Sequence, residues 1–393
     1  MKKKGIVFSL ISLGALFYFF ANFQRIAIPG AVFDLLQSEL SVSAPYITAF
    51  GAIFMYLYAF NQLIIGVLVD RFGGLRIMLT GGIILGVGAL LFPISSNLPL
   101  MYFSRVLVGI GGSTFYLSLI RELRECFSDK NFGIAISVML CIGYSGGIAA
   151  NAPFVFLMKY INWREILVIL ALIILLGVII FAILSTRIKF PEINRNVKLR
   201  TLPFRLVLHK KHNRNLFSFA CCNFGISYAI QAIIGKKFLE DFCGMSTYKS
   251  ALVLSAMAVI AAIFNIINAS VITFGCLLVI CICLIFNIKT DFIAIIFFIL
   301  AANASLTSLL VPVLHLTNRK MVSGKAVSIM NFCFFTMVGL LGTAMGFLLN
   351  LFAPEQKGNI LVYSNHSYLA VFGLFFLLSV FELYKAMKLS DKY

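Results

Sequence analysis

The stretch GVLVDRFGGLR, residues 66–76, is a short charged interruption between two long apolar runs of this 393-residue chain. The flanking runs, residues 44–69 and 76–94, are each close to or above the about 20 residues that a helix needs to cross a bilayer. Asp70 can meet a helix terminus or a neighbouring base, and Gly73 permits a tight reversal. The two arginines favour the cytoplasmic side. The stretch therefore predicts two membrane helices joined by a tight inner loop.

The whole composition agrees with a chain whose main solvent is lipid. Apolar residues make up 61% and charged residues 12%, against roughly 45–50% and about 25% in a soluble domain, and the mean hydropathy is +1.01. This excludes a cytosolic enzyme and a secreted disulfide scaffold. The net charge of +18 comes from bases clustered between apolar runs, so we expect contact with membrane lipids and no nucleic acid. The nine cysteines lie mostly inside these runs and are interpreted as small buried hydrophobes.

The apolar runs predict an all-α integral membrane protein with twelve transmembrane helices. The run after Lys2, Lys3 and Lys4 is too long for a signal peptide and is interpreted as an uncleaved first helix. The helices are expected near residues 5–36, 44–69, 76–94, 99–120, 132–158, 163–186, 215–236, 249–266, 270–288, 291–316, 324–352 and 366–388.

The distribution of bases predicts the topology. With the amino terminus inside, 23 Lys and Arg fall on the inner side and 7 on the outer side, and only Arg25 and Arg105 lie within helices. This excess predicts a multi-pass protein of the plasma (inner) membrane with both termini in the cytoplasm.

A basic linker divides the chain into two halves. Residues 187–214 hold nine bases and one acid, which predicts a first six-helix bundle over residues 1–186 and a second over residues 215–393. A shift of 203 residues aligns the entries to helices 2 and 8, whereas GIAIS and GKAVS align with a shift of 191. We therefore expect two pseudo-symmetric bundles, the second lacking about 12 residues between helices 8 and 9.

Three motifs resemble those of the major facilitator superfamily. Residues 66–76 resemble its loop between helices 2 and 3, the residues from Arg105 to Gly112 resemble its second motif, and NWRE at 162–165 is similar to its entry to helix 6. The resemblance implies a carrier of two helix bundles that transports a small-molecule substrate by alternating access. It also implies a monomer without cofactor or metal. It implies a gating role for Gly66, Asp70, Arg71, Gly73 and Arg76. Gly74 and Leu75 depart from the usual basic positions, and helix 5 lacks the Gly-Pro pair of proton-linked drug exporters.

Arg25 is the first candidate for substrate binding. All fourteen acids are expected in loops or near helix ends, whereas an arginine deep in a bilayer costs at least about 2.5–3.5 kcal/mol and should face a watery cavity and an anion. Tyr18, Asn22, Arg25 and Pro29 follow at helical spacing and predict one polar stripe. Arg25 also resembles the helix 1 arginine of organic-anion members of the superfamily. In the alternative interpretation, its side chain only extends to the outer surface.

Arg105 is the second candidate, on a stripe with Gly109, Gly112 and Tyr116. It either faces the cavity or binds carbonyl groups at a helix end. Further substrate-binding candidates, each of which also suits simple helix packing, are Tyr144, Asn151, Tyr228 and Gln231.

These features predict a secondary active transporter of a small organic anion, a carboxylate or an organophosphate. The sequence leaves open whether an ion is coupled to transport. Apart from Asp34 and Glu39, no titratable carboxylate is expected deep in the membrane. An intramembrane enzyme is disfavoured, because the four histidines are scattered and no buried acid is expected. The alternatives are a transporter-like sensor, a decayed carrier that no longer cycles, and a drug or sugar transporter of the same superfamily.

Overall fold

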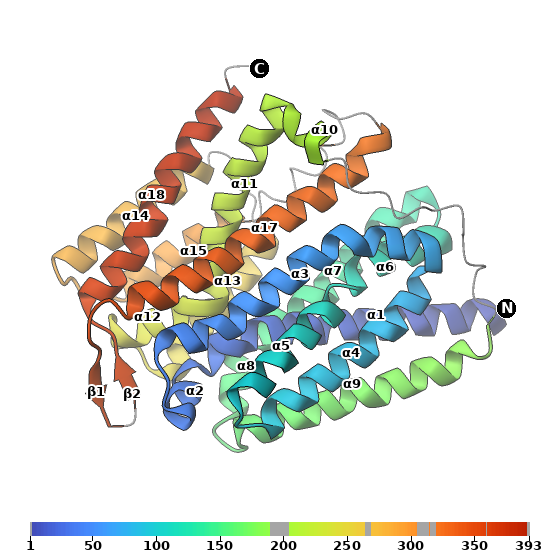
Figure 1. Cartoon of the computed structure of the whole chain (residues 1–393), viewed down its shortest axis with the longest axis horizontal. Helices are drawn as coiled ribbons and strands as arrows, with labels where there is room; N and C mark the ends of the chain where they lie inside the picture. The colour runs from blue at the N-terminus through green and yellow to red at the C-terminus, as the bar shows by residue number, and fades with distance from the viewer. Residues whose placement is uncertain are drawn as a thin grey trace. The chain divides into compact units, whose positions relative to one another are not determined.

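A computed structural model of the chain describes residues 2–188, 204–263, 269–304, 314, 320–358 and 360–390. The chain divides into two compact units (Figure 1). The first holds residues 1–25 and 53–201, and the second holds residues 26–52 and 202–393. Residues 26–52, which the sequence groups with the first bundle, thus pack in the second unit. The division after Thr201 falls within the predicted linker, of which residues 189–203 lie outside the described residues.

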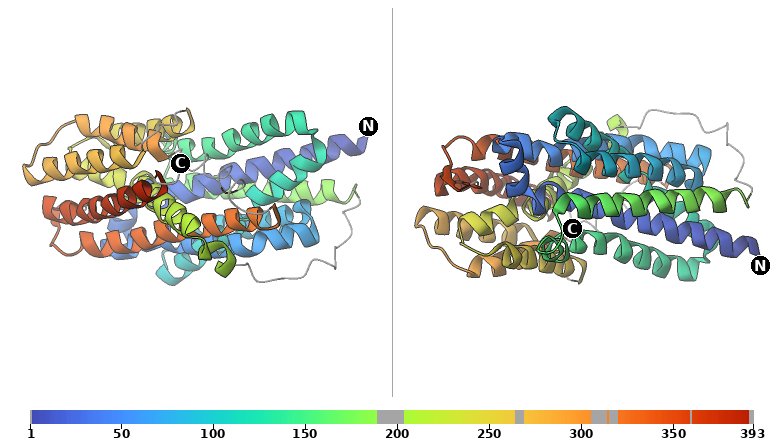
Figure 2. Two further views of the ribbon diagram at one scale, coloured as in Figure 1. Left: turned by 90° about the horizontal axis from the view of Figure 1, so that it is seen from above. Right: turned by 90° about the horizontal axis from the view of Figure 1, so that it is seen from below.

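The described secondary-structure elements of the first unit are helices. Its long helices run alongside one another in both views of Figure 2, and α4 packs against α5, α6 and α9. Its elements are α1 (Lys2–Ile26), α3 (Ala44–Phe72) from Ile53 onward, α4 (Gly74–Ile94), α5 (Leu98–Gly112), α6 (Phe115–Cys126), α7 (Asp129–Ala149), α8 (Ala152–Leu157) and α9 (Trp163–Ser185).

The second unit adds two strands to its helices. α18 packs against α11, α14 and α17, and a small antiparallel pair joins β1 to β2. Its elements are η1 (Ala27–Ala31), α2 (Phe33–Leu40), the start of α3, α10 (Phe204–His209), α11 (Lys211–Ala229), η2 (Ile230–Ile234), α12 (Gly235–Asp241), α13 (Thr247–Ile263), α14 (Ala269–Ile285), α15 (Phe292–Ala304), α17 (Lys320–Leu349), β1 (Glu355–Lys357), β2 (Ile360–Val362) and α18 (Asn365–Ser390).

The helices agree with the predicted apolar runs. Among the described residues, nine helices are long and apolar enough to cross a membrane, and three shorter apolar helices cover Thr247–Ala261, Ser270–Ile285 and Phe292–Ala302. Each predicted run corresponds to one of these twelve. The end of the predicted tenth helix, residues 305–316, lies outside the described residues except for Leu314.

Local sequence explains where helices begin and how closely they pack. Asn97 caps α5 by accepting a hydrogen bond from the Leu100 amide at 3.2 Å, and Asn162 caps α9 through the Arg164 amide at 2.9 Å. A Cβ atom on Gly111 would lie 2.5 Å from the backbone nitrogen of Leu85. Only glycine therefore allows the backbones of α4 and α5 to approach this closely.

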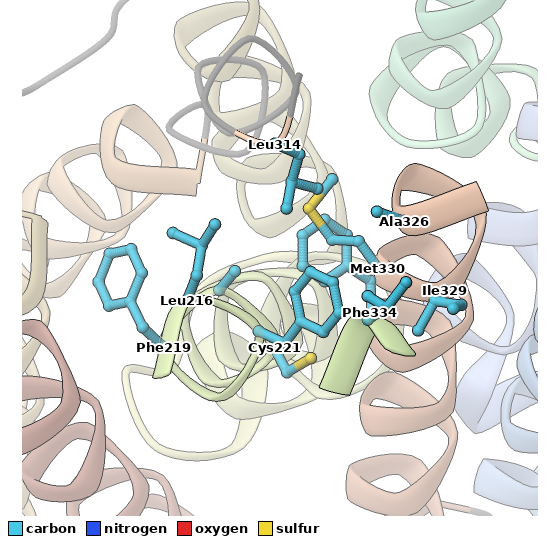
Figure 3. Close-up of a cluster of buried hydrophobic side chains, with 11 residues drawn as sticks. Leu216, Phe219, Cys221, Leu314, Ala326, Ile329, Met330 and Phe334 are labelled. Atoms are coloured by element: carbon cyan, nitrogen blue, oxygen red, sulfur yellow. The ribbon is translucent and has the colours of Figure 1, made fainter. Parts of the chain in front are cut away.

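A hydrophobic cluster holds α11 to α17 in the second unit (Figure 3). Cys221 lies within it as a small apolar side chain, in agreement with the interpretation of the cysteines in apolar runs. In a bilayer, whose lipid tails are as apolar as leucine, such a cluster stabilises the helix pair through close van der Waals packing. The labelled members are Leu216, Phe219, Cys221, Leu314, Ala326, Ile329, Met330 and Phe334.

Candidate functional site

Arg25 lies in the last turn of α1 and is only 7% exposed. Its Nη2 donates a hydrogen bond to Oδ1 of Asn22, and its guanidinium carbon is 5.9 Å from the centre of the Tyr58 ring. Nδ2 of Asn22 donates in turn to the carbonyl oxygen of Tyr18 at 2.8 Å. Tyr18, Asn22 and Arg25 thus form a hydrogen-bonded series, in which a neutral amide orients the guanidinium.

The predicted stripe does not continue to Pro29. α1 ends at Ile26, and Ile28 has extended dihedral angles, φ −120° and ψ 116°. A proline disfavours helical geometry in the residue before it, which explains the break. The helix predicted as continuous over residues 5–36 is therefore interrupted directly after Arg25.

Arg105 is fully buried on α5 and binds backbone on α1. Its Nη1 donates to the carbonyl oxygen of Gln24 at 3.1 Å, and its guanidinium carbon lies 5.0 Å from the ring centre of Phe54 and 5.9 Å from that of Phe92. This is the carbonyl-binding geometry that the sequence offered as one alternative. Gln24 directly precedes Arg25, so this hydrogen bond fixes the backbone of α1 next to Arg25.

Two further tyrosines lie beside Tyr18, the first residue of the series. The ring centre of Tyr18 lies 6.3 Å from that of Tyr116 and 6.5 Å from that of Tyr144. Tyr18 is buried, whereas Tyr144 is 47% exposed. Aromatic side chains on α1, α6 and α7 therefore meet beside the Arg25 series.

Asn151 lies at a break that the sequence did not predict. The helix expected over residues 132–158 is divided into α7 and α8, because Pro153 lies in the first turn of α8 and cannot continue the helix ladder. The Asn151 side chain is fully buried, and its Nδ2 donates to the Gly147 carbonyl at 3.0 Å. Its Oδ1 is buried without a hydrogen-bond partner. The spacing of seven from Tyr144 thus does not correspond to one continuous helix face.

Tyr228 and Gln231 belong to the second unit. Tyr228 is 9% exposed on α11 and stacks on Phe224 with ring centres 5.3 Å apart. Gln231 is half-buried in the π-helical turn η2. The structure therefore brings Tyr18, Asn22, Arg25, Arg105 and Tyr144 together in the first unit, and places these two candidates on another unit.

The motif at residues 66–76 forms the turn between α3 and α4. Gly73 has a φ of 87°, which favours glycine, between α3 and α4. Arg76 donates to the Phe72 carbonyl at 3.1 Å, while Asp70 is exposed and Arg71 lies 5.4 Å from the Phe72 ring centre. A Cβ on Gly66 would meet only Leu117 at 3.9 Å, an ordinary contact.

Two α6 residues complete this loop, and sequence reasoning missed them. Arg121 donates to the Val69 carbonyl, and the buried Glu122 accepts a hydrogen bond from the Leu75 amide at 3.2 Å. The available signal is the charged run at the end of α6, which by itself indicates only a cluster of bases on the inner side.

Lys237 is a buried cation that sequence reasoning assigned to an outer loop. It lies on α12 and is 1% exposed. Its Nζ is 2.7 Å from Oδ1 of Asp34 and 2.8 Å from Oδ1 of Asp241, and it donates to the Leu361 carbonyl at 2.7 Å. Two carboxylates thus balance this charge within the second unit.

Two tyrosines extend the Lys237 network. The hydroxyl of Tyr368 donates to Oδ2 of Asp241 at 2.7 Å, and the Tyr363 amide donates to the same atom at 3.0 Å. Nε2 of Gln37 donates to the Tyr363 hydroxyl at 2.7 Å. Burial raises the pKa of Tyr363, against the lowering effects of the Gln37 bond and the Lys237 charge. Tyr363 therefore stays a neutral phenol at neutral pH.

Glu382 corrects the expectation that every acid lies in a loop or near a helix end. It lies within α18 and its side chain is fully buried. Nδ2 of Asn223 donates to its Oε1 at 3.0 Å. The sequence placed Glu382 near the end of the helix expected over residues 366–388.

The first-unit arrangement places a buried guanidinium where it can bind an anion. A buried guanidinium presents a rigid fork that matches a carboxylate, a phosphate or a sulfonate. Among the described residues, no group of three or more His, Cys, Asp or Glu side chains is placed to hold a metal ion.

Comparison with solved structures shows the same fold. A bacterial homologue of the human lysosomal transporter Spinster, in an inward-facing and unoccupied conformation, is 16% identical with a TM-score of 0.69, covering 98% of this chain and 95% of that one. A point mutant of the nucleoside transporter NupG is 13% identical with a TM-score of 0.70, covering 95% of this chain and 99% of that one. Both likenesses concern the fold alone.

Comparison with sequences identifies the family. A probable sulfoacetate transporter, SauU of Cupriavidus necator, is 22% identical over 161 residues, which are 41% of this chain and 37% of that protein. The match thus spans little more than a third of the relative. The family model of the Major Facilitator Superfamily matches residues 14–343. With that match and the shared fold, the chain is a multi-pass membrane protein and belongs to the major facilitator superfamily of transporters.

Proposed function

We propose that the chain is a secondary active carrier of a small organic anion, working by alternating access between two six-helix bundles. The observation that carries the proposal is the buried Arg25, whose described contacts are the Asn22 amide and the Tyr58 ring. Asn22 and the helix turn before it hold the guanidinium in a fixed orientation, and its planar fork matches a carboxylate or a phosphate in charge and geometry. The distant likeness to a probable sulfoacetate transporter supports this substrate class.

Each candidate has a proposed role. Arg25 binds the anion, and Asn22 and Tyr18 orient it. Arg105 is a positioning residue that fixes the Gln24 carbonyl and adds positive potential. The remaining candidates orient the substrate: Tyr144, Asn151, Tyr228 and Gln231.

The inner loop and the topology complete the proposal. Asp70, Arg71 and Arg76 act in the inner gate. Gly73 forms the tight backbone turn of this gate. We propose a monomer in the inner membrane with both termini in the cytoplasm, as the distribution of bases predicts.

Reconstitution of the full chain into proteoliposomes tests the substrate class. Uptake of sulfoacetate, succinate and glycerol 3-phosphate is compared with that of uridine and glucose. We expect uptake of at least one anion, loss of this uptake in Arg25→Ala, and little change in Arg124→Ala, which removes an exposed charge of the same unit. Uptake of the neutral compounds alone, unchanged by Arg25→Ala, contradicts an anion carrier.

A further inference from the structure

Glu382 and Asn223 form an isolated polar pair between apolar helices of the second unit. Glu382 is fully buried on α18, and Asn223 is 1% exposed on α11. One hydrogen bond joins them, from Nδ2 of Asn223 to Oε1 of Glu382, and Nδ2 also lies 3.4 Å from Oγ1 of Thr273 on α14. Three helices therefore enclose the carboxyl group.

Two acceptor atoms of the pair are left without a hydrogen bond. Oε2 of Glu382 and Oδ1 of Asn223 are both buried and have no partner. A carboxylate only accepts hydrogen bonds, whereas a carboxylic acid also donates one. When Oε2 of Glu382 carries a proton, it becomes a hydrogen-bond donor. Oδ1 of Asn223 can then accept that hydrogen bond. A carboxylic acid and a carboxamide can then share two hydrogen bonds in one ring.

The surroundings of the carboxyl group supply thiols and no described ion pair. Cys222 on α11 lies close enough to Glu382 for the two groups to interact electrostatically. The other described titratable side chains on the helices packed against α18 are Lys211, His212, Arg214, Cys221 and Tyr228 on α11, Cys276, Cys281 and Cys283 on α14, and Cys333 on α17, which bonds Cys221. Lys211, His212 and Arg214 lie nine or more residues before Asn223 along α11. On α18 itself, Lys385 lies over Phe381 and Tyr384, and Lys388 bonds the Tyr384 hydroxyl. An ionised carboxylate in such surroundings is strongly disfavoured.

We propose that Glu382 and Asn223 form a binding site for one proton. The proton adds to Oε2 of the carboxylate, gives the neutral acid, and is released to water when the helices expose the pair. A cavity of about 390 Å³ is lined by Cys222, Phe381 and Arg214. Cys222 and Phe381 directly precede the two members of the pair, so the cavity opens on the two helices that carry them. This site does not depend on the identity of the transported anion.

Infrared spectroscopy of the purified full chain tests the site without a substrate. We expect the carbonyl stretching band of a protonated carboxyl group at neutral pH, lost at alkaline pH and absent in Glu382→Gln. Asn223→Leu should shift the band, because it removes the bonded amide. Asp241→Asn is the matched control, since Asp241 is a buried acid paired with Lys237, and should leave the band unchanged.

A second measurement uses the thermal stability. Glu382→Gln keeps the shape of the neutral acid, so its Tm should exceed that of the wild type at pH 9 and match it at pH 5. The wild type loses stability as the pH rises, because unfolding releases the carboxyl group to ionise. If the wild type shows no protonated band assignable to Glu382 at any pH above 5, or if the two proteins keep equal Tm values at both pH values, the proton site is wrong. Failure of anion uptake in the liposome assay leaves these outcomes unaffected.

Discussion

Buried positive charge has different described contacts in the two units. In the second unit, Lys237 contacts two carboxylates, Asp34 and Asp241, so its charge is balanced within the protein. In the first unit, the described contacts of Arg25 and Arg105 are an amide, a backbone carbonyl and aromatic rings. A lysine between two buried carboxylates has a structural role, because removal of one partner leaves the others uncompensated. The binding role proposed for the first unit rests on the orientation of the Arg25 guanidinium, whose fork matches an anion.

The largest expected effect comes from breaking the balanced charge. Lys237→Met leaves Asp34 and Asp241 buried beside an apolar side chain, and removal of one partner of a buried ion pair costs about 3–5 kcal/mol. We expect a strongly lowered Tm of the purified protein. The double variant Lys237→Met with Asp241→Asn should recover part of this loss, since it removes one uncompensated charge. An unchanged Tm in the single variant would falsify the structural role of Lys237.

The next effect separates binding from stability in the first unit. Arg25→Ala removes a charge-assisted hydrogen-bond donor for the substrate, worth about 1.5–3 kcal/mol, or roughly 10- to 150-fold in affinity. We expect this loss in transport assays of the reconstituted protein, with a smaller loss in Arg25→Lys, which keeps the charge but not the fork. A fall in Tm as large as that of Lys237→Met would show instead that both cations are structural.

A pair of matched tyrosine variants sharpens the comparison. Tyr368→Phe removes a hydroxyl that donates to the buried Asp241 carboxylate, and should cost about 1.5 kcal/mol of stability. Tyr18→Phe keeps the ring contacts with Tyr116 and Tyr144, so it should leave the Tm unchanged and weaken anion uptake by less than about tenfold. Equal effects of the two variants on Tm would remove the distinction between the units.

The smallest effect is expected at the surface. Lys249 and Asp291 form an ion pair in which both side chains are more than half exposed, and such pairs contribute about 0–1 kcal/mol. Lys249→Met should therefore change the Tm little, and salt should reduce the difference further. Thermal unfolding at low and high salt measures both. A loss comparable to that of Lys237→Met would mean that burial does not decide the strength of these pairs.

Much of the fold could be predicted because the bilayer imposes one length and one polarity on every crossing. Each apolar run located one of the twelve apolar helices among the described residues, Gly73 marked the turn between α3 and α4, and NWRE at residues 162–165 marked the entry to α9. The breaks at Ile28 and Asn151 were missed. Ile28 directly precedes Pro29, and Asn151 precedes Pro153 by two residues, but Pro99 lies in the first turn of α5 without a break, so the residue type alone does not decide.

The candidate site was predicted only where it depends on one helix. The Tyr18, Asn22 and Arg25 series follows from helical spacing, and the structure joins these residues by hydrogen bonds. Glu382 was missed because its bonded partner, Asn223, lies 159 residues away along the chain, and Lys237 was missed because Asp34 belongs to a distant segment. Such contacts have no local signal in a single sequence.

The hydrogen bond from Arg105 to Gln24 ends on the main chain, and both polar atoms of the Gln24 side chain are buried without a hydrogen bond. The identity of residue 24 is therefore irrelevant to this anchor, and a search for co-varying residue pairs would pass over it. Amide hydrogen exchange would reveal it, since loss of Arg105 should loosen the terminal turn of α1 whatever amino acid occupies that position.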